Sequence, residues 1–174
     1  MIKIIYNNSV KNLGDKISQK KDAVPAGGTT SALNGYLGVS LLKLVLEVSK
    51  KNFNQKDREY IENILVEAEN KFLNLMEKDI KVFKENNKNK FANKKDLKKL
   101  IEVPLEIYTT STEMLDLKNK FKNKIKKTVK ADYEVALENI NTAKKCAETI
   151  IKSNYSFFDK NSEFIKEIKN KLDN

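Results

Sequence analysis

The chain contains no histidine and no tryptophan, and only one cysteine and one arginine among its 174 residues. Without imidazole it cannot form Ser-His-Asp or Cys-His nucleophile systems, a His proton relay or a zinc site with His ligands. Any proton transfer must therefore use a carboxylate, Lys, Tyr or water. A lone Cys146 has no partner for a disulfide or a Cys-x-x-Cys site, so we expect no metal and a reducing, cytoplasmic location.

Long apolar runs are also missing. The best run, Leu37 to Leu46, is interrupted by Lys43 and is well short of the ~20 residues that span a bilayer. The opening segment, Met1 to Tyr6, lacks the apolar region and the small-residue cleavage site of a signal peptide. We therefore expect no membrane partner and no cleaved leader.

The net charge of +10 raises the question of nucleic-acid binding. Arg58 is the only arginine, so the bidentate fork that dominates specific phosphate and guanine recognition is nearly absent. The lysines are scattered among Asn, Asp and Glu along the whole chain. We expect a solvated basic surface that binds no nucleic acid but attracts acidic small molecules.

Helix breakers are rare: the two prolines are Pro25 and Pro104, and four of the five glycines lie between residues 27 and 38. No alternating strand pattern or hairpin turn signal is present. The length suits one domain, 1–174. The pattern predicts an all-α fold with helices near 9–22, 29–52, 55–87, 95–127, 129–153 and 160–172; Ser9 can cap the first of them.

The stretch 24–38 places Pro25 and flexible glycines before a predicted helix start that Thr29 or Thr30 can cap. Free N–H groups and the positive end of the helix dipole there favour an anion or a carbonyl oxygen. Gly35 and Gly38 continue along one face of the helix. Such small residues allow close approach by another helix or by a ligand.

Asp79 interrupts the apolar stripe of the third predicted helix, which reads 61, 65, 68, 72, 75/76, 79 and 83. Burial of an unpaired carboxylate costs several kcal/mol, so Asp79 must be paired, protonated or facing a wet cleft. Desolvation would raise its pKa towards the range useful for proton transfer, whereas a Lys partner would lower it. Asp79 is therefore either a cap or ion-pair partner of a neighbouring helix, or a catalytic or ligand-binding group.

Three further positions are candidates. Pro104 lies mid-stripe in the fourth predicted helix, where it should kink or split the helix and free the carbonyl of Leu100. Asp132 and Asn154 lie at the two ends of the apolar stripe of the fifth helix, and Asp132 is equally explained as a first-turn acid that complements the helix dipole. Cys146, among alanines, is expected to be a small buried residue.

Four collinear stretches resemble the cyclodeaminase/cyclohydrolase family of tetrahydrofolate enzymes, which includes the C-terminal domain of formiminotransferase-cyclodeaminase. Residues 24–38 are similar to the family's proline and glycine opening, 75–83 to its Asp-x-x-x-Phe helix, 102–105 to its Val-Pro-Leu kink, and Ala131-Asp132 with Asn154 to its last core helix. The similarity spans about residues 9–165.

The resemblance implies an up-and-down bundle of about five long helices with a short C-terminal helix, and a homodimer. It also implies cyclisation of 5-formimidoyltetrahydrofolate to 5,10-methenyltetrahydrofolate with release of ammonia, without a metal. Asp79 falls on the position of the acid/base aspartate. Gly27, Gly28 and Thr29 would approach the folate through backbone N–H groups, Asp132 and Asn154 would bind the pterin, and surface Lys would attract the glutamate tail, polyglutamylated or not.

The chain departs from the family pattern at Ala26, where a third glycine is usual, at Ala131, a usual Ser, at Asn141, a usual Glu, and at Ile150, a usual Asn. Two or three of these changes remove polar groups expected to face the site. Two alternatives therefore stand beside cyclodeamination: hydrolysis of the methenyl bridge by a methenyltetrahydrofolate cyclohydrolase, and a non-catalytic folate-binding or structural helical protein.

Overall fold

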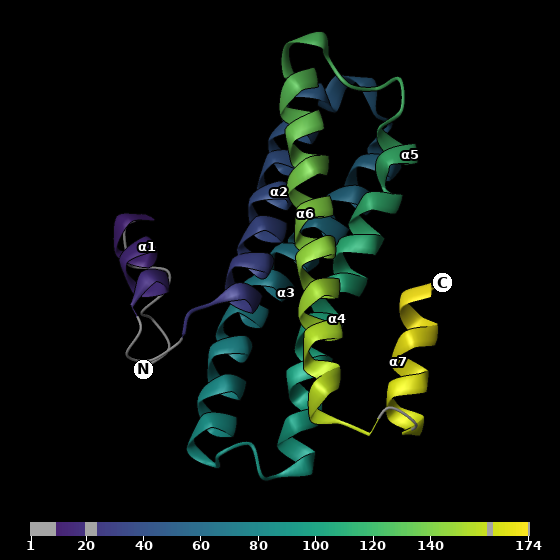
Figure 1. Cartoon of the computed structure of the whole chain (residues 1–174). Helices are drawn as coiled ribbons and strands as arrows, with labels where there is room; N and C mark the ends of the chain where they lie inside the picture. Colours follow the sequence, from purple (N-terminus) through teal and green to yellow (C-terminus); the bar gives the residue numbers. More distant parts are fainter. Residues whose placement is uncertain (1–9, 20–23, 160–161, 174) are drawn as a thin grey trace.

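Four long helices form an up-and-down bundle in the computed structural model, which describes residues 10–19, 24–159 and 162–173 (Figure 1). They are α2 (Gly27–Ser49), α3 (Gln55–Lys88), α4 (Lys94–Asp116) and α6 (Lys130–Asn154). Helices α2 and α4 each pack against both α3 and α6. No strand occurs among the described residues, so the predicted all-α bundle is confirmed.

Short elements complete the chain. α1 (Val10–Ser18) stands clear of the bundle on the side of α2, and α7 (Glu163–Asp173) lies beside the lower half of α4 and α6 (Figure 1). The others are α5 (Lys118–Phe121) and three single-turn 3-10 helices, η1 (Lys50–Asn52), η2 (Lys127–Val129) and η3 (Tyr155–Phe157). The Ser9 cap and the signal-peptide expectation for 1–6 concern positions outside the described residues.

Helix starts follow local capping chemistry at two of the long helices. The Asn54 side chain accepts a hydrogen bond from the Asp57 N–H at the start of α3, and Asn93 accepts one from the Lys95 N–H at the start of α4. The predicted cap of α2 was wrong. This helix begins at Gly27, with no side-chain cap from Ala26, and the Thr30 hydroxyl bonds instead to the carbonyls of Ala26 and Gly27.

The fourth helix is shorter than the predicted 95–127. It passes through Pro104 without a break and ends at Asp116, after which the chain turns over the end of the bundle. Buried Leu117, Phe121 and Val129 anchor this turn, and Asn123 adopts a left-handed conformation within it. The segment that follows Asp116 is rich in Lys and Asn and offers no continuous apolar face on which a helix could pack. The chain is therefore held by the packing of these three residues and does not continue as a helix.

The expectation of a buried Cys146 was also wrong, since its side chain is exposed. The buried stripe of α6 steps through residues 136, 140, 143, 147 and 151. Cys146 is one residue before Ala147 and therefore about 100° away from it around the helix. The free thiol faces outward between the Lys and Glu side chains of that helix.

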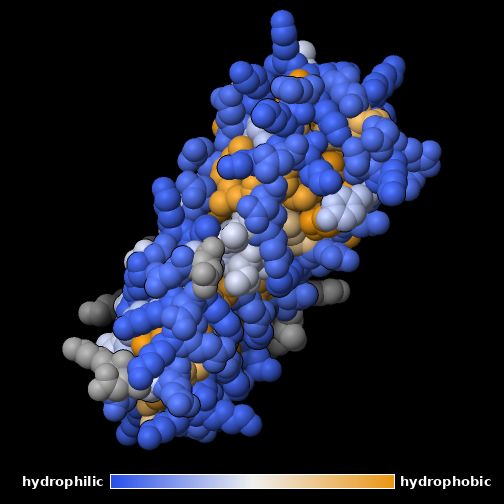
Figure 2. Space-filling view, turned by 90° about the vertical axis from the view of Figure 1, so that its right-hand side faces the viewer, coloured by the Kyte–Doolittle hydropathy of each residue, from blue (hydrophilic) through white to orange (hydrophobic). Residues whose placement is uncertain are grey.

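Apolar surface is uneven. Hydrophilic residues cover most of the face in Figure 2, with apolar residues showing between them, mainly in the upper half. Segment Gly27–Asn52 is the one described helix long and apolar enough, by length and composition, to cross a membrane. A central bundle helix meets the same criterion, and the packing of α2 between α3 and α6 accounts for much of its apolar character.

Candidate active site

The cavity of interest lies where α2 begins, part of the way along the bundle formed by the other three long helices (Figure 1). Its volume is about 220 Å³. The lining comes from the turn before α2, from α3 and α4, from the turn between them, and from the end of α6: Val24, Ala26, Gly27, Gly28, Asp79, Val82, Phe83, Phe91, Lys99, Leu100, Val103, Pro104, Ile150, Asn154 and Phe157.

Asp79 is the titratable group held most strongly out of water in this cavity. Its Oδ2 accepts a hydrogen bond of 2.8 Å from the Thr29 hydroxyl. Burial raises the pKa of Asp79 above its ordinary value of 3.8, while the side-chain hydroxyl and backbone N–H of Thr29 oppose that rise. The protein thus stabilises the neutral acid relative to water but keeps donors in place for the carboxylate.

Gly28 allows this contact. A Cβ built on Gly28 would stand 2.0 Å from Oδ1 of Asp79, so only glycine leaves room for the carboxyl group over the first turn of α2. The N-terminal N–H groups of a helix lack partners within the helix, and α2 has no cap of its own. Asp79 therefore caps α2 from α3 while its carboxyl group also lines the cavity, so the capping role left open by the sequence does not remove Asp79 from the candidate site.

Asn154 makes the second polar contact at the wall of the cavity. Its Nδ2 donates a 2.7 Å hydrogen bond to the carbonyl of Leu100. Pro104 has no N–H to donate to this carbonyl, which an ordinary helix would pair with residue 104. The group freed by Pro104 is therefore bound by Asn154 of α6, so Asn154 joins α4 to α6 at the cavity wall.

Thr29 is near the site but turned away from the cavity. Its side chain is fully buried and its hydroxyl is committed to Asp79. Gly27 and Gly28 line the cavity directly. The backbone N–H of Thr29, which the sequence analysis predicted to approach the substrate, also interacts with the carboxyl group of Asp79.

Asp132 is not brought to the cavity. It lies in the first turn of α6, whereas Asn154 is the last residue of the same helix. At 1.5 Å per residue, about 33 Å separate them within the chain. The prediction that both bind one pterin is therefore corrected within a single subunit, and Asp132 stands where an acid complements the helix dipole.

Gly35 and Gly38 serve helix packing. A Cβ at Gly35 would meet the ring of Phe72 on α3 at 2.4 Å, and a Cβ at Gly38 would meet Ile140 on α6 at 2.5 Å. The face of α2 that packs on α3 and the face that packs on α6 therefore each need a residue without a side chain. The alternative of a ligand at these two glycines has no support in this geometry.

Sequence reasoning missed Phe91, Lys99 and Phe157, which line the cavity from outside the motifs. Phe91 lies in the turn after α3, and Phe157 in η3, so their positions depend on how two turns close. The ammonium group of Lys99 lies 3.0 Å from Asp96 and 4.0 Å from Glu85. No pattern in the sequence marked these three residues.

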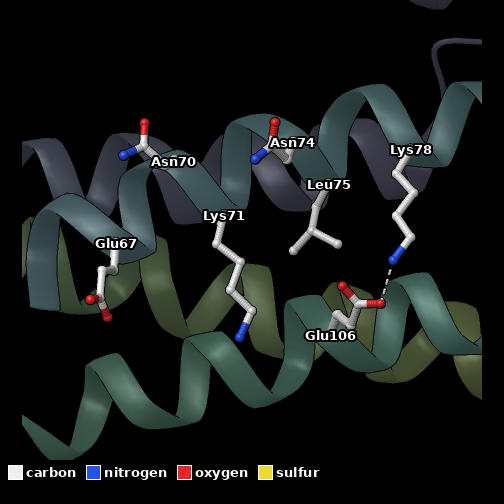
Figure 3. A pocket seen from close by; sticks show the side chains of 7 residues that line it. All are labelled: Glu67, Asn70, Lys71, Asn74, Leu75, Lys78 and Glu106. Atoms are coloured by element: carbon white, nitrogen blue, oxygen red, sulfur yellow. Dashed lines mark hydrogen bonds and ion pairs between the residues drawn. The ribbon is translucent and has the colours of Figure 1, made fainter.

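A larger hollow, of about 420 Å³, lies on the outer face between α3 and α4 (Figure 3). Its lining is almost entirely polar, and Lys78 closes one end through an ion pair with Glu106 at 2.5 Å. Among the described residues, no three Cys, Asp or Glu side chains gather as a metal site.

Comparisons with known proteins agree with this fold. The family model described as formiminotransferase-cyclodeaminase matches residues 9–174, and the chain belongs to this family. The fold is similar to the crystal structure of formiminotetrahydrofolate cyclodeaminase from Thermotoga maritima, with a TM-score of 0.86 at 18% identity over 97% of this chain and 88% of that one. A comparison with curated protein sequences finds no match.

Proposed function

We propose that this protein is a formimidoyltetrahydrofolate cyclodeaminase, which converts 5-formimidoyltetrahydrofolate to 5,10-methenyltetrahydrofolate and ammonia. The observation that carries the proposal is Asp79, a carboxyl group with a pKa raised by burial, held by Thr29 over a glycine turn inside a cavity. Membership of the family supports a folate substrate.

The reaction needs one group to move two protons. The N10 amine attacks the formimidoyl carbon, forming a C–N bond, and must lose its proton. The substrate enters as the protonated amidine, so the attack leaves an amino group on that carbon. This nitrogen must gain one further proton before its C–N bond breaks, ammonia leaves and the positive charge stays on the methenyl bridge. A carboxyl group whose pKa is raised by burial can accept the first proton as the carboxylate and donate it again as the neutral acid.

Other cavity groups would position the substrate. The N–H groups of Gly27 and Gly28, at the positive end of α2, would face the one-carbon unit. Asn154 presents its amide oxygen as a remaining acceptor while Nδ2 holds Leu100. Lys99, at the cavity wall, would attract a carboxylate of the glutamate tail, whether or not the tail is extended.

One observation favours a second candidate. Ile150 lines the cavity, with Cδ1 3.5 Å from the site of a Cβ on Gly27, where the family resemblance places an Asn. The loss of that amide leaves less to bind a departing ammonia. Hydrolysis of the methenyl bridge by water, with Asp79 as general base, is therefore the alternative reaction, and folate binding without turnover is the third.

We further propose a homodimer that works in the cytoplasm. The outward face of α2 carries a continuous apolar stripe: Leu33, Leu37, Leu41, Leu44 and Val48. Leu37 and Leu44 are 44% and 46% exposed, so the other helices of the subunit leave much of these two side chains uncovered. A second copy placed on this stripe would bury it. A single exposed Cys146 suits a reducing compartment.

The test is a spectrophotometric assay with each folate in turn. With 5-formimidoyltetrahydrofolate, the methenyl absorbance should build up; its decay from added methenyltetrahydrofolate would support the hydrolase instead. Asp79→Asn should lower the rate by about 100-fold or more. Asp132→Asn is the matched variant, because Asp132 lies at the opposite end of α6 from Asn154 and does not line the cavity, and it should retain the rate. An Asp79→Asn protein with full activity would contradict the proposal.

A further inference from the structure

Three phenyl rings form one wall of the cavity. Phe83 comes from α3, Phe91 from the turn between α3 and α4, and Phe157 from η3. The rings of Phe91 and Phe157 are stacked, with centroids 5.4 Å apart and an angle of 7° between their planes. Phe83 meets Phe91 edge-on at 6.0 Å. The wall is thus an aromatic stack that stands beside the candidate acid.

The two stacked rings are held very differently. The Phe91 N–H donates to the carbonyl of Asn86 at 2.9 Å, and buried Asn86 is itself bonded to the carbonyls of Val82 and Asp96. Phe91 also adopts a left-handed backbone conformation, with φ of 56°. Such a conformation persists in a non-glycine residue only where the surroundings enforce it. Phe91 is therefore fixed in place.

Phe157 has few such restraints. It lies in a 3-10 helix of three residues and is 42% exposed, although its ring lies against Phe91. The cavity of about 220 Å³ is smaller than the ~300–1,000 Å³ usual for ligand sites. A folate would need more room than this cavity offers, and Phe157 is the exposed ring at its edge.

We propose that the pterin ring of the substrate takes the place of Phe157 on the face of Phe91, and that Phe157 moves outward to admit it. The inference rests on the proposed folate substrate and adds the residues that select a planar heterocycle. Asp79 and Phe83 are one helical turn apart on α3, so a ring on this wall lies within about one turn of the carboxyl group. Stacking would thus orient the reacting edge towards the acid.

The absence of tryptophan from the chain makes the movement measurable, because Phe157→Trp introduces a single indole, which can be excited selectively over the six tyrosines. The probe is 5-formyltetrahydrofolate, an analogue without the departing nitrogen. On binding, acrylamide should quench the indole of the Phe157→Trp variant more strongly than in the free protein. Phe158→Trp is the matched control, since the Phe158 ring packs against Phe164 at 5.4 Å and does not line the cavity. Its quenching should not change.

The stacking partner is tested separately. Phe91→Leu keeps an apolar residue but removes the π face, and should raise the dissociation constant of 5-formyltetrahydrofolate by about tenfold, while Phe158→Leu leaves it unchanged. Unaltered binding by Phe91→Leu, unaltered quenching in Phe157→Trp, or failure of the probe to bind would each overturn the inference.

These readouts separate the inference from the proposed reaction. The probe could bind and displace the indole of Phe157→Trp while the unsubstituted protein turns over neither folate. That result would support the stacking site and refute the proposed enzyme activity. Turnover with an unchanged KM in Phe91→Leu would support the enzyme and refute the stacking site.

Discussion

In the proposed enzyme, Asp79 would satisfy a structural and a chemical demand together. Its carboxyl group supplies the cap that α2 lacks, and the same contacts hold it at the cavity. Removal from water raises its pKa, which a simple surface cap would not experience. The stability that the cap contributes is therefore partly offset by the cost of keeping the charged form out of water.

This balance predicts a pH-dependent effect of Asp79→Asn on stability. The folded protein binds the Asp79 proton more tightly than the unfolded chain, so ionisation lowers the free energy of unfolding as the pH rises through the native pKa. Asn at position 79 carries no charge, so the Asp79→Asn variant does not lose this stability as the pH rises. We expect a melting temperature a few degrees above that of the unsubstituted protein at pH 7, with the difference shrinking towards pH 3.8.

Thermal melts of both proteins across this pH range check the prediction. A difference that is constant with pH, or that grows on acidification, would show that burial does not dominate the pKa of Asp79. Loss of activity together with retained or higher stability would separate the chemical role of the carboxyl group from its capping role.

A second prediction concerns Gly28 and Gly38 in the same helix. Gly28→Ala forces the carboxyl group of Asp79 to move, and misplacement by about 1 Å can cost about 100-fold in rate. Gly38→Ala meets the Ala136 carbonyl and Ile140 instead, about 15 Å along α2. We expect Gly28→Ala to lose turnover with little change in melting temperature, and Gly38→Ala to show the reverse. Equal losses of turnover in both would refute this division.

At the scale of elements, the contact between α4 and α6 depends on Pro104 and Asn154 together. Asn154→Ala leaves the Leu100 carbonyl without its donor and should cost about 1–3 kcal/mol of stability. Pro104→Ala restores an N–H that can pair with that carbonyl inside α4. Asn154→Ala should therefore cost less in the Pro104→Ala background.

Denaturant unfolding of the four proteins in this double-mutant cycle gives the coupling energy, which we expect to be about 1 kcal/mol. Additive effects would mean that Asn154 and Pro104 act independently. The readout is stability alone, so it does not depend on the identity of the substrate.

The elements were predictable where periodicity decides them. The stripe of α3 and the small-residue face of α2 indicated helices within a few residues of those observed, and the interruption of the stripe at Asp79 indicated a residue that lines the cavity. The distance between two residues along one helix was not taken into account. Asp132 and Asn154 were predicted to bind the same pterin, but they lie at opposite ends of α6. Phe91 and Phe157 were beyond prediction because turns, set by tertiary packing, bring them together.

At the scale of the whole molecule, the apolar stripe on α2 predicts self-association. Leu37→Glu places a charge at the centre of the stripe and should convert a dimer to a monomer, because burying an unpaired carboxylate costs several kcal/mol. Asn63→Glu, at an exposed position on α3, is the matched control. Sedimentation equilibrium checks the masses. A monomer before substitution, or a dimer after it, would contradict the proposed interface.

The late start of α2 has a wider consequence. Three helices continue past the point where the fourth begins, and the acid on α3 meets the first turn of α2 at that step. Adding or removing one turn at the start of α2 would change the depth of the cavity beside Asp79 by about 5.4 Å and leave the other three helices of the bundle unchanged. Evolution could therefore adjust this architecture to larger or smaller substrates by changing the length of a single short stretch of chain.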